Sequence, residues 1–252
     1  MKVEFLHHSS FLVEVDDKVL IFDYFQGDRV KNYHFTGVLP EYESDTPIYL
    51  FASHKHQDHF DLDNLRLAEK YSNIHFIFSK DTKSSPNFLK RHGINPDVTK
   101  KICYVGPNAK YKVEDLNIET YRSTDAGVAF YVETNGAAFF HAGDLNDWKW
   151  EGAGDLVNGM MESNYKAQIR KLANKPINLA FVPMDPRMGK YQDAGIDYFL
   201  RHTDAEYVFP MHMWQDYSGI ERYCKKLSNA QMAQRIVPIV HENQIFDILE
   251  KK

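Results

Sequence analysis

The chain has 252 residues and a formal net charge of −5, and 43% of its residues are hydrophobic and 26% charged. This balance is typical of a globular protein, and the excess of acidic residues offers no broad positive surface to a polyanion. We therefore expect no nucleic-acid partner. No 18 apolar residues run together, and the N-terminus lacks the apolar core of a signal peptide, so we expect a cytoplasmic protein without a membrane partner.

Short β-rich runs fill the first part of the chain. They predict strands at residues 3–6, 11–15, 19–22, 47–51 and 74–78. Apolar residues at helical spacing predict a helix over 61–71 and another over 80–92, interrupted near Pro86.

The second part of the chain alternates between strands and helices. Strands are expected at 101–105, 111–113, 117–121, 128–133, 137–141, 178–182, 207–211, 236–240 and 245–249, and helices at 160–173, 192–203 and 220–227. Asn135-Gly136 predicts a tight hairpin between two of these strands. No repeat or linker separates the segments, so residues 1–252 are expected to form a single domain of two sheets with helices outside.

Four side chains with metal-binding chemistry directly follow the expected strand 47–51. They are His54, His56, Asp58 and His59. Imidazole nitrogen suits zinc and similar metals, and a carboxylate oxygen adds a harder ligand. Alternate residues of an extended loop face the same way, so His54 and His56 are candidates for one ion, and Asp58 and His59 for a second. The alternative is a solvated polar loop.

This His-x-His-x-Asp-His pattern resembles the signature of the metallo-β-lactamase superfamily. Two later segments resemble the same family in the expected order, namely Phe-Phe-His-Ala-Gly-Asp at 139–144 and Val-Phe-Pro-Met-His at 208–212. The opening, with His-Ser-Ser-Phe at 8–11 and Ile-Phe-Asp at 21–23, resembles the branch that includes ascorbate-6-phosphate lactonase.

The resemblance implies an α+β fold, a four-layer αββα sandwich, with two divalent metal ions at one edge. It implies that His54 and His56 bind the first ion, that Asp58, His59 and His212 bind the second, and that Asp144 bridges them. From the residues alone, Asp144 equally suits a turn and His212 equally suits a surface histidine. Histidine ligands favour zinc, whereas an oxygen-rich set leaves manganese or iron open.

The chain departs from the family pattern at one place. The family commonly has a Gly-His-Thr-like motif between the first cluster and the bridging aspartate, but residues 123–127 read Ser-Thr-Asp-Ala-Gly, without a histidine. Asp125 is the candidate replacement, because a carboxylate binds the same metals. The alternative is an ordinary loop aspartate in an Asx turn.

Two residues are candidates for binding a substrate. His8 ends the first expected strand, and Arg187 follows the strand 178–182 with a guanidinium suited to phosphate or carboxylate. The alternatives are a structural histidine and a loop salt bridge.

Paired metal ions provide an activated water for hydrolysis, and Asp58 is the candidate to orient it or to carry its proton. We expect a hydrolase acting on a small-molecule ester, lactone or phosphodiester, such as a phosphorylated sugar lactone. A phosphodiesterase or nuclease is the alternative enzyme, and a non-catalytic metal-binding protein is the alternative that the missing histidine favours. The oligomeric state stays open, a homo-oligomer included.

Overall fold

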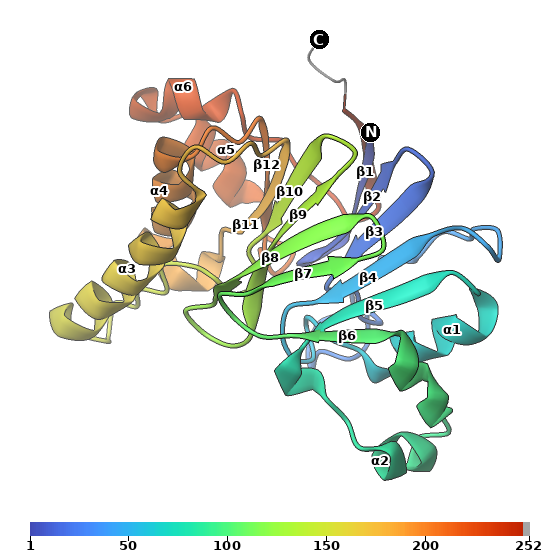
Figure 1. Ribbon diagram of the computed structural model, residues 1–252. Coiled ribbons are helices and arrows are strands. Elements are labelled where there is room, and N and C mark those ends of the chain that lie inside the picture. The colour runs from blue at the N-terminus through green and yellow to red at the C-terminus, as the bar shows by residue number, and fades with distance from the viewer. Residues whose placement is uncertain (249–252) are drawn as a thin grey trace. The chain divides into compact units, whose positions relative to one another are not determined.

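The computed structural model describes residues 1–248, which fall into two compact units (Figure 1). The first unit is formed by residues 1–106 together with the C-terminal segment from Glu242, and the second by residues 107–241. Each unit contains one mixed sheet with its helices, which confirms the expected α+β class. The single domain expected over residues 1–252 stays a prediction.

Within the described residues, the sheet of the first unit has seven strands in the order β13-β1-β2-β3-β4-β5-β6. They are β1 (Lys2–His7), β2 (Ser10–Val15), β3 (Lys18–Phe22), β4 (Ile48–Ala52), β5 (Ile74–Ser79), β6 (Ile102–Val105) and β13 (Gln244–Asp247). Neighbours from β13 to β3 pair antiparallel, and neighbours from β3 to β6 pair parallel. Consequently β1, β3 and β4 run in one direction, and their carboxyl ends lie at the same edge of the sheet.

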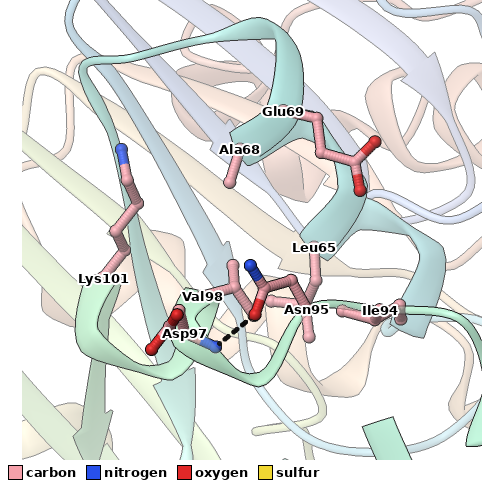
Figure 2. A pocket seen from close by; sticks show the side chains of 8 residues that line it. All are labelled: Leu65, Ala68, Glu69, Ile94, Asn95, Asp97, Val98 and Lys101. Carbon is pink, nitrogen blue, oxygen red and sulfur yellow. Dashed lines mark hydrogen bonds between the residues drawn. The ribbon is translucent and has the colours of Figure 1, made fainter. Parts of the chain in front are cut away.

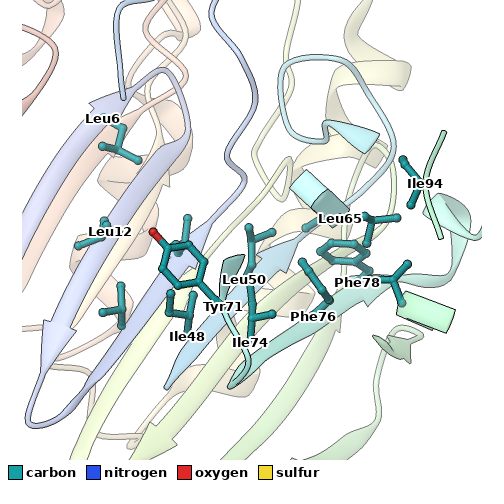
Figure 3. Packing of buried hydrophobic residues seen from close by; sticks show 14 of the residues in the cluster. Leu6, Leu12, Ile48, Leu50, Leu65, Tyr71, Ile74, Phe76, Phe78 and Ile94 are labelled. Atoms are coloured by element: carbon teal, nitrogen blue, oxygen red, sulfur yellow. The ribbon is translucent and has the colours of Figure 1, made fainter. Parts of the chain in front are cut away.

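Short helices follow β4 and β5. They are η1 (Leu62–Arg66), α1 (Leu67–Lys70), η2 (Lys80–Thr82), α2 (Pro86–Arg91) and η3 (Pro96–Lys101). Their apolar side chains pack with alternate residues of the strands, such as Ile48 and Leu50 of β4, in one buried cluster. Figure 3 shows Leu65 of η1 in this cluster together with Phe78 and Ile94. Fully burying one such side chain stabilises the fold by about 1.5–3 kcal/mol.

The sheet of the second unit has six strands among the described residues, in the order β12-β11-β10-β9-β8-β7. They are β7 (Lys110–Val113), β8 (Leu116–Arg122), β9 (Val128–Thr134), β10 (Ala137–His141), β11 (Leu179–Pro183) and β12 (Tyr207–Met211). β10, β11 and β12 pair parallel, whereas β7 to β10 pair antiparallel. The carboxyl ends of β8, β10, β11 and β12 therefore share one edge of this sheet.

The helices of the second unit connect its parallel strands or follow the last of them. They are α3 (Asp155–Ile169), η4 (Arg170–Leu172), η5 (Pro186–Tyr191), α4 (Ala194–His202), α5 (Ser218–Cys224), η6 (Leu227–Asn229) and α6 (Ala230–Ala233). Throughout residues 1–248, every helix is too short or too polar to cross a bilayer.

The predicted elements agree with the structure, apart from one strand and several boundaries. The strand expected over 236–240 is wrong within the described chain. Ile236 makes only an isolated parallel bridge to Val208, and Pro238 has no N–H group for a strand ladder. The last strand is β13, which ends at Asp247, and Leu249 of the expected 245–249 lies outside the described residues.

Helix boundaries differ because caps and proline act locally. Pro86 is the first residue of α2 and does not interrupt a longer helix, since the first turn tolerates a residue without an N–H group. α3 begins at Asp155, five residues before the expected start, and exposes Leu156 and Met160. These exposed apolar residues hide the amphipathic pattern from which a helix start is predicted.

Two glycines allow opposite predictions about stability. A Cβ added at Gly27 would lie 1.6 Å from the carbonyl oxygen of Phe35, so backbone would have to move. We expect Gly27→Ala to destabilise the protein by about 1–3 kcal/mol. Gly159 is exposed within α3, with no atom within 4 Å of an added Cβ, and Gly159→Ala should stabilise by about 0.5–1 kcal/mol. Chemical denaturation measures both, and an unchanged midpoint for Gly27→Ala would contradict the tight packing.

Candidate functional site

Three strand ends at one edge of the first sheet carry histidine or aspartate. β1 is followed by His8, β3 by Asp23, and β4 by Ser53 and His54. Because β1, β3 and β4 run in the same direction, these side chains gather at the edge where α/β sheets commonly bind ligands. The strand that was expected to deliver the histidine cluster therefore does so.

The carboxylate of Asp23 organises this edge. Its Oδ1 accepts a hydrogen bond from the Ser53 backbone N–H at 2.7 Å, and its Oδ2 accepts one from the Ser53 hydroxyl at 2.6 Å. His59 Nδ1 lies 2.8 Å from the same Oδ2. All three side chains are fully buried. Since a carboxylate only accepts hydrogen bonds, His59 Nδ1 carries the proton and its Nε2 keeps the lone pair that a metal needs.

The same network fixes the tautomer of His54. The Ser53 hydroxyl gives its proton to Asp23, so its oxygen accepts a hydrogen bond from His54 Nδ1 at 2.9 Å. His54 Nε2 is thereby left as the basic nitrogen, and it lies 2.9 Å from His56 Nδ1. His56 is exposed, whereas His54 is buried. Two histidines thus present nitrogen atoms to a common point.

A tight turn brings Asp58 and His59 back toward the sheet edge. The backbone N–H of His59 donates to the carbonyl of His56 at 3.0 Å. Asp58 Oδ2 lies 3.8 Å from His59 Nε2 and 3.3 Å from His8 Nε2. His8, Asp58 and His59 each offer a ligand atom within 4.8 Å of the other two. His8, predicted to contact substrate, therefore lies beside two predicted ligands.

The second unit gathers its own acidic and imidazole groups at one sheet edge. Asp144 follows β10, Asp185 follows β11, and His212 follows β12 directly. His212 Nε2 lies 3.4 Å from Asp144 Oδ1, and both side chains are buried. His141 Nδ1 accepts a hydrogen bond from the Gly143 N–H at 3.1 Å and so holds the turn before Asp144.

Asp185 has the same relation to His212 that Asp23 has to His59. Its buried carboxylate accepts a hydrogen bond from His212 Nδ1 at 3.0 Å and another from Trp214 Nε1 at 3.2 Å. Burial raises the pKa of Asp185, but hydrogen bonds from His212 and Arg187 outweigh it, so its pKa lies below the usual range. The carboxylate is therefore ionised, and His212 Nε2 is the nitrogen left for a ligand role.

Arg187, predicted to bind substrate, is engaged with Asp185. Its Nε and Nη2 donate to the Asp185 carboxylate at distances between 2.6 and 3.0 Å. The guanidinium also stacks over the Trp214 ring, 4.3 Å from its centroid, and the Arg187 side chain is 48% exposed. This geometry favours the salt-bridge alternative. The contacts of Asp185 with His212 and Trp214 could not be predicted from the sequence, because these partners lie 27 and 29 residues away.

Asp125 follows β8 at the same edge of the second sheet, but its side chain is exposed. Its backbone N–H donates to Ser123 Oγ at 3.1 Å. The neighbouring Thr124 hydroxyl donates to the Asn146 carbonyl at 2.6 Å, which ties this loop to the segment after Asp144. The loop is thus anchored close in sequence to Asp125, which is itself exposed.

The distances at both edges suit shared metal ions. Two ligands bound at 2.0–2.2 Å to one ion lie about 3.0–3.5 Å apart. The separations of 3.3 Å for His8 and Asp58 and 3.4 Å for Asp144 and His212 lie in that range, and the 2.9 Å for His54 and His56 lies just below it. The 3.8 Å between Asp58 and His59 needs only a small side-chain shift. Neutral imidazoles and carboxylates also have the chemistry that zinc, manganese or iron requires.

A separate hollow of about 210 Å³ lies in the first unit (Figure 2). Leu65 of η1 and Ala68 of α1 line it on one side, and Ile94, just before η3, and Val98 of η3 line it on the other. η3 leads into the amino end of β6, which is parallel to β4, so this hollow lies away from the carboxyl ends that carry the histidines.

A family model described as the β-lactamase superfamily domain matches residues 2–151, more than half of the chain. The matched segment includes the histidine cluster, Asp125 and Asp144, and it ends before Asp185 and His212. No curated protein matches the chain in sequence.

Several solved structures share the fold. Igni18, a metallo hydrolase from the archaeon Ignicoccus hospitalis, matches 98% of this chain and 99% of its own, with 18% identity and a TM-score of 0.57. Zinc-bound PqqB from Methylobacterium extorquens matches 98% and 100%, with 14% identity and a TM-score of 0.55. CmlA, a diiron β-hydroxylase from Streptomyces venezuelae, matches 93% of this chain but 46% of its own, with 11% identity and a TM-score of 0.53. At these identities the likeness shows the fold alone.

The Asp23 network predicts a measurable loss of metal affinity. Asp23→Asn replaces one acceptor oxygen with an NH₂ group, which only donates hydrogen bonds. The variant side chain therefore cannot accept the hydrogen bonds from both Ser53 and His59. We expect zinc affinity to fall about 10–100-fold, as for other groups that orient metal-binding histidines. Asp16→Asn is the matched control, because Asp16 has a positive φ of 51°, similar to that of Asp23, but lies in an exposed turn. Equal zinc affinity for the two variants would contradict the role of Asp23.

Proposed function

The chain belongs to the β-lactamase superfamily, and on that premise we propose that it is a metal-dependent hydrolase of a small-molecule ester, lactone or phosphodiester. The family match, together with one mixed sheet in each unit, confirms the metallo-β-lactamase fold expected from the sequence. The observation that carries the proposal is the pair of buried aspartates that hold the proton of His59 and of His212 on Nδ1.

The proposal assigns the metal ligands as the family order implies. His54 and His56 hold one ion, Asp58, His59 and His212 hold the other, and Asp144 bridges the two. Buried tautomers set by Asp23 and Asp185, and ligand atoms spaced for a common ion, support these roles. Zinc is the proposed metal because imidazole dominates the ligand set, and iron and manganese are the competing outcomes of metal analysis.

The chemistry divides between the metal ions and Asp58. When bound, such ions lower the pKa of a water molecule and polarise the substrate oxygen under attack. The Asp58 side chain is 17% exposed, unlike the fully buried His59, so it is the carboxylate that can reach a substrate or a water. We propose that Asp58 orients the attacking water and carries its proton to the leaving group.

The substrate class follows from charge and from the opening of the chain. A net charge of −5 disfavours a polyanion, which supports a small molecule over a nucleic acid. The likeness of residues 8–11 and 21–23 to the ascorbate-6-phosphate lactonase branch makes a phosphorylated sugar lactone the first substrate to test.

One experiment separates the competing functions. Purified protein is analysed for metal identity and stoichiometry, and the metal-loaded form is assayed against lactones, phosphodiesters and phosphomonoesters. Turnover of lactones supports the proposal, and turnover of phosphodiesters alone supports the phosphodiesterase alternative. Two bound ions without turnover of any substrate would support a non-catalytic metal-binding protein.

His56 provides a direct test of the ligand assignment. Because His56 is exposed and follows the core strand, His56→Ala should abolish metal-dependent hydrolysis and leave thermal unfolding of the metal-free protein nearly unchanged. His34→Ala is the control, since His34 is an exposed histidine that lies beside Asp28, outside the proposed ligand set. Wild-type turnover by a metal-loaded His56→Ala protein would remove His56 from the centre.

Asp144 and Asp125 give contrasting predictions. Asp144→Ala should lower occupancy at both metal positions, because a bridging carboxylate binds each ion and offsets their mutual repulsion.

Asp125→Ala should lower occupancy of one position if its exposed carboxylate turns inward to replace the missing histidine, and Asp125→His should then restore it. Elemental analysis measures all three variants. Two full equivalents in Asp144→Ala would contradict the bridge, and two in Asp125→Ala would leave Asp125 as a turn residue.

A further inference from the structure

The turn between β1 and β2 is buried, although it consists of polar residues. His8 and Ser9 connect the two strands, and their exposed fractions are 2% and 0%. Connecting turns normally lie at the surface, because their polar groups need water. His8 also has a positive φ of 49°, a conformation that costs free energy for a residue other than glycine and that clusters at functional sites. A buried polar turn with a positive φ destabilises the fold, so its presence points to a functional role for His8.

Aromatic side chains fix the orientation of the His8 ring. Its centroid lies 5.4 Å from that of Phe35 and 6.3 Å from that of Phe25, and both phenylalanines are buried. The ring also meets His59 edge to face at 5.9 Å. Packed in this way, the imidazole directs Nε2 to within 3.3 Å of Asp58 Oδ2.

We propose that His8 is a further metal ligand, which binds the same ion as Asp58 and His59. This inference rests on the proposed function, which assigns that ion to the latter two residues. The 3.3 Å between His8 Nε2 and Asp58 Oδ2 fits two ligands of one ion at 2.0–2.2 Å each. With His8, the first unit provides three of the ligands proposed for this ion, in addition to His212 and the bridging Asp144 that the proposed function assigns to it.

The competing role for His8 is a hydrogen bond that orients Asp58 without touching the metal. The two roles differ in what remains when the imidazole is removed. A ligand leaves a vacant coordination position that a free imidazole can fill, whereas an orienting residue leaves the coordination of the ion unchanged. Chemical rescue by imidazole therefore distinguishes them.

The test titrates metal-free wild type and His8→Gly with Co²⁺, and follows visible absorption with and without added imidazole. Glycine tolerates the positive φ at this position and leaves room for an imidazole ring. We expect one of two Co²⁺ equivalents to bind at least about tenfold more weakly, with an altered spectrum. Added imidazole should restore the affinity and the spectrum of that equivalent.

A second variant guards against misfolding. Asparagine also favours a positive φ but fills part of the space, so His8→Asn should lose the same equivalent and should not respond to imidazole. Thermal unfolding of the metal-free proteins checks the fold. If both variants bound two equivalents with wild-type affinity and spectrum, His8 would be no ligand, and the proposed function would stand. If wild type itself bound no Co²⁺, the proposed function would fail, and the inference with it.

Discussion

The candidate site of the first unit depends on one buried carboxylate, that of Asp23. It accepts hydrogen bonds from Ser53 and His59, and Ser53 in turn accepts one from His54, so a single side chain determines which nitrogen of two histidines is basic. A fully buried carboxylate costs several kcal/mol of desolvation unless its partners offset that cost. The network offsets it, and the outcome is a pair of imidazoles held in the tautomer that binds metal.

Strand direction explains why these groups meet. β2 lies between β1 and β3 and pairs antiparallel with both, so β1 and β3 run in the same direction. β4 pairs parallel with β3 and therefore shares this direction. Their carboxyl ends therefore place His8, Asp23 and His54 at one edge. In the second sheet, the parallel strands β10, β11 and β12 do the same for Asp144, Asp185 and His212. In each case the sheet is the scaffold, and the residues just beyond it carry the chemistry.

The sequence predicted the parts of this arrangement that are local. Four metal-binding side chains lie within six positions after a β-rich run, namely His54, His56, Asp58 and His59. Both their spacing and the preceding strand could therefore be recognised in the sequence. The role of Asp23 and Asp185 in orienting histidines was not predicted, because the histidines lie 36 and 27 residues away and no periodicity links them. The strand expected over 236–240 failed for the opposite reason, since a β-rich composition cannot supply the N–H group that Pro238 lacks.

Each unit contains a buried aspartate that orients a histidine, and the two aspartates differ in their other partners. Asp23 pairs with His59 at 2.8 Å and Asp185 with His212 at 3.0 Å, and each carboxylate is fully buried. Asp23 accepts hydrogen bonds from Ser53 and His59, and Asp185 pairs with the Arg187 guanidinium, which is itself stacked on Trp214. A carboxylate already neutralised by arginine transfers less negative charge to its histidine. Arg187 should consequently make His212 a weaker donor than it would be beside an unpaired carboxylate, and hold His212 more rigidly in place.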